Sequence, residues 1–141
     1  ALRQLAESGP GSLSVLVVRV VAADGAQIAA TNAQLKDDVF TDEFSLKTGY
    51  GQCSKDQLII EPATGNGVSD GIMTLNIDIN AVNGNKNSLQ QEMLKKAGEE
   101  YGNLSSQYDL VMVCQPPGSG SWVAYAYINS WISFYNDYWC Q

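Results

Sequence analysis

The chain has 141 residues, with eight Lys and Arg against 15 Asp and Glu, three Cys and no His. This length suits one domain, and the net charge of −7 argues against a nucleic-acid partner, which needs a basic face. Without His, the chain can build neither Ser-His-Asp nor Cys-His machinery from its own residues, nor a zinc helix with two His ligands.

The first elements are a flexible lead-in and a strand. Residues 1–12 end in Gly-Pro-Gly-Ser and predict a flexible lead-in, which leaves residues 13–141 as a single α/β domain. Residues 14–23 are almost all apolar and mostly β-branched, which predicts a central strand buried on both faces. No run reaches the roughly 18 apolar residues that a membrane span needs.

A helix and two strands follow. Thr31 and Gln34 fit a capping box and predict a helix to about Val39, with a turn or short helix over residues 44–50. Residues 57–61 predict a strand that Pro62 ends. Residues 72–79 alternate between apolar and polar, which predicts a half-buried, antiparallel strand.

The second half predicts one long helix and two more strands. Residues 88–101 carry a helical apolar stripe, with Ser88 as the predicted N-cap. Residues 108–114 and 122–128 predict strands, whereas residues 129–141 fit no element clearly. The order β, α, β, β, α, β, β predicts an α/β fold with two main helices on a mixed, mostly parallel sheet of about five strands.

Aromatic side chains gather near the C-terminus. Eight of the 13 aromatic residues lie within residues 122–139, and no Lys or Arg follows Lys96. Such a block can form a sugar-binding or peptide-binding face, or it can be core and interface packing.

The cysteines and one asparagine carry further expectations. Cys114 ends a predicted buried strand and Cys53 precedes another, so the topology predicts a Cys53–Cys114 disulfide. Asn103-Leu104-Ser105 fits the N-glycosylation acceptor pattern. Few charges and many Asn, Ser and Gly favour a secreted protein.

Three segments carry a resemblance to a known family: residues 50–54 (YGQCS), residues 114–118 (CQPPG) and residues 122–140. With them, residues 13–141 resemble the first half of the catalytic domain of the gametolysin-type zinc metallopeptidases, which are metzincin-related enzymes of algae. The resemblance implies a metzincin-like N-terminal subdomain and a secreted endopeptidase that acts on extracellular or cell-wall proteins.

In that family the zinc motif, two His four residues apart with a Glu between them, follows the aromatic segment. The resemblance therefore implies zinc only if the chain continues beyond Gln141, and it assigns no catalytic residue or metal ligand here. It also implies that an extended substrate pairs with an edge strand. The residues expected to contact substrate or a partner are Trp122, Tyr125, Tyr127 and Trp131.

The alternative is a non-catalytic pseudo-protease domain that serves as a binding or structural subunit. Both hypotheses expect a protein partner or a missing C-terminal half to cover the aromatic block.

Overall fold

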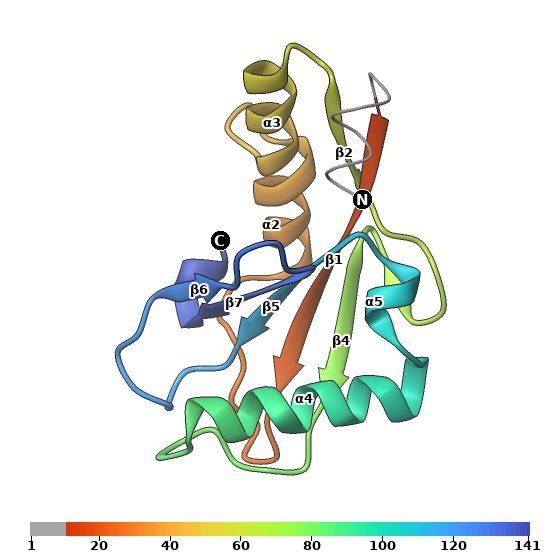
Figure 1. Cartoon of the computed structure of the whole chain (residues 1–141). Coiled ribbons are helices and arrows are strands. Elements are labelled where there is room, and N and C mark those ends of the chain that lie inside the picture. Colours follow the sequence, from red (N-terminus) through yellow and green to blue (C-terminus); the bar gives the residue numbers. More distant parts are fainter. Residues whose placement is uncertain (1–10) are drawn as a thin grey trace.

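A computed structural model describes residues 11–141 of the chain. The predicted lead-in over residues 1–12 lies outside these residues except for Gly11 and Ser12, which already belong to the first strand. Two helical layers sandwich one sheet (Figure 1). No helix within residues 11–141 is long and apolar enough to cross a membrane.

One mixed sheet contains seven strands: β1 (Gly11–Val21), β2 (Leu58–Pro62), β3 (Val68–Ser69), β4 (Ile72–Asn76), β5 (Leu110–Gln115), β6 (Ala124–Ala126) and β7 (Ile132–Asn136). The order is β3-β4-β1-β5-β7-β6, and β2 pairs with the first half of β1. Strands β2, β4, β1, β5 and β7 are parallel, while β3 and β6 run antiparallel to their neighbours. The predicted α/β class is confirmed, with seven strands instead of about five.

Helices cover the two faces of the sheet. On one face lie α2 (Asn32–Lys36), its π-helical continuation η1 (Asp37–Thr41), and α3 (Leu46–Ser54). On the other face lie α4 (Lys86–Tyr101) and the short α5 (Leu104–Gln107). A 3₁₀ turn, η2 (Asp137–Cys140), follows β7.

Strand β1 is the centre of the core. Its residues alternate between the two faces, as the pleat of a strand requires. Leu16, Val18 and Val20 pack toward α4, and Leu13, Val15 and Val17 pack toward α2 and η1. The predicted central strand buried on both faces is confirmed.

Strand β4 corrects one prediction in part: it pairs in parallel with β1 along its whole length, and it is antiparallel only to the two-residue β3. Its alternation reflects burial: Met73 and Leu75 are buried while Thr74 and Asn76 are exposed. A sheet with one partly exposed face produces that pattern whatever the strand direction, so the alternation could not report the direction.

Helix boundaries follow the caps. Thr31 and Gln34 form the predicted capping box of α2. Helix α4 starts earlier than predicted, because the Asn85 side chain accepts hydrogen bonds from the amides of Asn87 and Ser88. Asn and Ser are comparable N-caps, so Asn85 takes the position assigned to Ser88.

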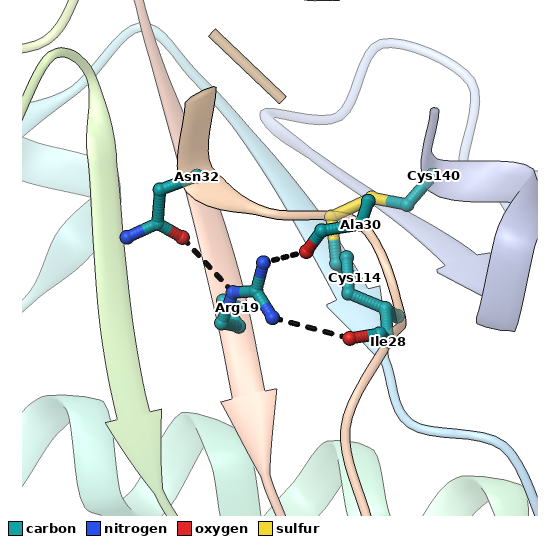
Figure 2. The surroundings of a disulfide bond; sticks show 6 residues. All are labelled: Arg19, Ile28, Ala30, Asn32, Cys114 and Cys140. Carbon is teal, nitrogen blue, oxygen red and sulfur yellow. Dashed lines mark hydrogen bonds between the residues drawn. A yellow bond between two sulfur atoms is a disulfide. The ribbon is translucent and has the colours of Figure 1, made fainter. Parts of the chain in front are cut away.

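Arg19 carries a charge into the middle of β1, where it is 8% exposed. Figure 2 shows its guanidinium directed at the carbonyls of Ile28 and Ala30 and at the side chain of Asn32. Nε lies 3.0 Å from Asn32 Oδ1 and Nη1 lies 3.1 Å from the Ile28 oxygen. Burial lowers the pKa of Arg19, and no carboxylate within residues 11–141 forms an ion pair with it.

Arg19→Ala is expected to lower the free energy of unfolding by about 3 kcal/mol, because buried carbonyls lose their donors. Urea unfolding monitored by circular dichroism measures the loss. The matched control is Lys95→Ala, which removes an exposed pair with Glu92 and is expected to cost less than about 0.5 kcal/mol. Equal losses in the two variants would contradict the structural importance of Arg19.

Candidate functional site

Strand β6 forms one edge of the sheet and is shorter than the predicted strand over residues 122–128. The amide of Asn136 on β7 donates to the carbonyl of Val123, at 2.9 Å. Bonded positions alternate in an antiparallel pair, so Ala124 and Ala126 direct their main-chain groups away from β7. Both alanines are exposed. The edge therefore offers free main-chain donors and acceptors to an extended peptide.

Three of the four predicted contact residues gather around this edge. The ring centroids of Trp122 and Tyr125 are 5.8 Å apart, and those of Tyr125 and Tyr127 are also 5.8 Å apart. Tyr125 also packs on Phe134, at 5.4 Å. Trp131 lies just before β7 and instead lines hollows on both sides of the sheet. The aromatic cluster is defined here as Trp122, Tyr125 and Tyr127.

A cation lies over this cluster. Lys86 Nζ, at the start of α4, is 5.4 Å from the Trp122 ring centroid and 4.8 Å from that of Tyr125. Such contacts contribute about 0.5–1 kcal/mol at exposed sites. Lys86 could not be identified from the sequence. The aromatic block itself contains no Lys or Arg, and Lys86 lies far from Trp122 and Tyr125 along the chain.

Hydrogen bonds fix β6 to the rest of the domain. The Tyr125 hydroxyl donates to the Gln90 side chain, and Gln90 Nε2 donates to Gln115 Oε1 at 3.1 Å. Gln115 Nε2 in turn donates to the Lys86 carbonyl, at 3.3 Å. Burial raises the pKa of Tyr125, which keeps its phenol a donor. This chain holds β6, α4 and the end of β5 in one arrangement.

Asn136 holds the loop before β6. Its Nδ2 donates to the carbonyls of Gly120 and Trp122, at 3.1 and 2.7 Å. These two hydrogen bonds hold the turn that leads into the aromatic cluster.

Loop contacts close the carboxyl ends of the parallel strands, where open α/β sheets usually bind ligands. The amide of Asn83 donates to the Gly118 carbonyl at 3.0 Å, and the amide of Val82 donates to the Asp24 side chain at 3.0 Å. Gly118 has a φ of +118°, and a Cβ there would lie 2.9 Å from the Ala81 oxygen. Only glycine fits this close approach.

The predicted Cys53–Cys114 disulfide is wrong. Cys114 in β5 bonds to Cys140 in η2, with the two Cα atoms 5.5 Å apart (Figure 2). Cys53 is an exposed free thiol on α3. Strand β7 returns the chain beside β5 and brings Cys140 to Cys114. Residues 129–141 had no predicted element, so this return could not be anticipated.

An apolar hollow of about 220 Å³ lies beside α3 on the face of the sheet that α2 and α3 cover in part. Its lining includes Tyr50 from α3, Leu110 and Met112 from β5, and Tyr135 from β7. The Cys114–Cys140 disulfide belongs to the same face, since both cysteines join the cluster of Val15, Val17 and the α2 residues.

Metal-binding residues do not gather within the described part of the chain. No group of three Cys, Asp or Glu side chains there could hold an ion. Two of the three cysteines form the disulfide and the sequence has no His, so residues 11–141 do not by themselves fit a zinc site. No protein-family model, curated protein or solved structure matches the chain.

Alkylation of the native protein is expected to label one cysteine, Cys53, and alkylation after reduction is expected to label three. Peptide mass mapping identifies the sites. Labelling of Cys140 without reductant would contradict the disulfide.

Removing the disulfide with Cys114→Ser and Cys140→Ser is expected to cost about 3.5 kcal/mol of stability by the loop-entropy relation for a separation of 26 residues. The control Cys53→Ser changes an exposed side chain and is expected to leave the free energy of unfolding unchanged.

Proposed function

We propose that the chain is the amino-terminal part of the catalytic domain of a secreted, gametolysin-like zinc metalloendopeptidase. In this proposal β6 aligns an extended protein substrate, and the zinc ligands come from a segment beyond Gln141. The substrates expected from the resemblance are extracellular or cell-wall proteins. The chain described here would be inactive alone.

The single observation that carries the proposal is the free edge of β6. Ala124 and Ala126 present main-chain groups that a substrate strand can pair with, and both residues are exposed. The Tyr125 and Asn136 hydrogen bonds hold this edge in place, which limits the ordering that a peptide must undergo on binding.

The position of η2 also supports the proposal. The disulfide holds η2 against the face that carries the apolar hollow beside α3. A segment following Gln141 would start on that face and would find apolar surface from Leu110, Met112 and Tyr135 to pack on.

The alternative, a non-catalytic binding subunit, rests on the apolar side chains left exposed near β6. Ile128 is 94% exposed and Tyr127 is 62% exposed. Large exposed apolar patches mark interaction surfaces. The experiments below separate the two readings, because only the endopeptidase reading requires zinc and hydrolysis.

The full-length precursor is expected to continue into a segment with two His four residues apart and a Glu between them. Intact-mass measurement and peptide mapping of the protein from its source test this, together with one zinc per chain by elemental analysis. A mature protein that ends at Gln141 and contains no zinc would support the binding subunit instead.

Ala126→Pro in the full-length protein is expected to lower kcat/KM for a denatured protein substrate about tenfold. Proline removes one outward amide and so one main-chain hydrogen bond to the substrate. Ala126→Val is the matched control: it keeps the amide and is expected to retain most of the activity. Equal kcat/KM values for the two variants would contradict pairing at β6.

A further inference from the structure

An acceptor asparagine lies at the rim of an apolar hollow, on the side of the sheet away from α3. Asn103 sits in the turn between α4 and α5 and is exposed. It is the only asparagine in the sequence with Ser or Thr two positions later and no intervening Pro. This pattern, in a surface loop of a secreted protein, is the acceptor for N-linked glycans.

The side chain of Asn103 is already held in place. Its Oδ1 accepts from the Ser105 amide at 3.0 Å and from the Ser105 hydroxyl at 2.7 Å. The Gln107 side chain fixes the backbone by donating to the carbonyls of Tyr101 and Asn103, at 2.7 and 3.1 Å. These bonds leave Nδ2, the atom that carries a glycan, without a partner among the described residues.

The hollow next to Asn103 has a volume of about 390 Å³, within the range of small-ligand pockets. Asn103 is itself part of the lining, together with Leu94 and Gly98 of α4 and with Trp131. Gly98 leaves the space open, since a Cβ built there meets no atom within 4 Å. Trp131 is half-buried and packs at the edge of the core.

We propose that Asn103 is N-glycosylated and that its first N-acetylglucosamine packs in this hollow against Trp131. The apolar C–H face of the sugar then covers the indole and Leu94, which removes apolar surface from water. This inference needs passage through a secretory pathway but does not depend on the proposed peptidase function.

Glycosylation of Asn103 is a group transfer that involves no change of oxidation state. Asn103 Nδ2 bonds to the anomeric carbon of a lipid-pyrophosphate-linked oligosaccharide, supplied by the host cell with its transferase. The bond from that carbon to the pyrophosphate oxygen breaks, and the lipid pyrophosphate leaves with the electron pair. Nδ2 gives up one proton.

The first experiment measures occupancy. The full-length protein is secreted from a eukaryotic host and the peptide containing Asn103 is weighed before and after treatment with an amidase that removes N-glycans. A glycan mass on Asn103 is expected in the parent protein and in Ser106→Ala, and a complete loss is expected in Ser105→Ala. An unmodified Asn103 in the secreted parent protein would overturn the proposal.

The second experiment locates the sugar by thermal unfolding. Trimming the glycan to its first N-acetylglucosamine is expected to leave the melting midpoint unchanged. The unglycosylated Ser105→Ala variant is expected to melt about 3 °C lower than Ser106→Ala.

Gly98→Leu provides the blocking variant, because leucine is compatible with the helix and fills the hollow. In the Gly98→Leu background, the difference between Ser105→Ala and Ser106→Ala is expected to vanish. A difference of the same size in both backgrounds would overturn the packing against Trp131, and so would a midpoint that falls on trimming.

Discussion

The buried guanidinium of Arg19 fixes how the chain leaves the central strand. A charge removed from water must be surrounded by protein oxygens, and the segment before α2 supplies them from Ile28, Ala30 and Asn32. That segment cannot move without leaving the charge unpartnered. Because α2 begins at Asn32, the same contacts set where the α2–η1–α3 layer starts on the sheet.

Because β1 lies at the centre of the sheet, the contacts of Arg19 also affect the neighbouring strands. Strand β1 pairs with β2 and β4 on one side and with β5 on the other, where Arg19 lies opposite Cys114. The loop that Arg19 holds therefore lies beside the strand that anchors the disulfide (Figure 2). Loss of the guanidinium contacts would loosen one whole face of the sheet, whereas the α4 face would keep its own packing.

Local patterns predicted the elements and failed at the contacts between them. The apolar run around Val17 predicted the central strand, and the Thr31–Gln34 capping box predicted the start of α2, because both depend on neighbouring residues. Strand direction in β4 and the partner of Cys114 depend on chain crossings that no local pattern encodes. The candidate site divides in the same way: the aromatic residues were visible in the sequence, whereas Lys86 and its contacts with the rings were not.

The disulfide has a mechanical consequence. It connects β5 to η2 and closes a loop that contains β6 and β7 entirely. Tension on the chain at Gln141 therefore passes through the two sulfur atoms into β5, which shears against β1 along a parallel ladder. The hairpin of β6 and β7, which would otherwise unzip one bond at a time, carries none of that load. Force applied to the chain after Gln141 therefore does not reach β6. A peptide paired with β6 would contact an edge strand that this force leaves in place.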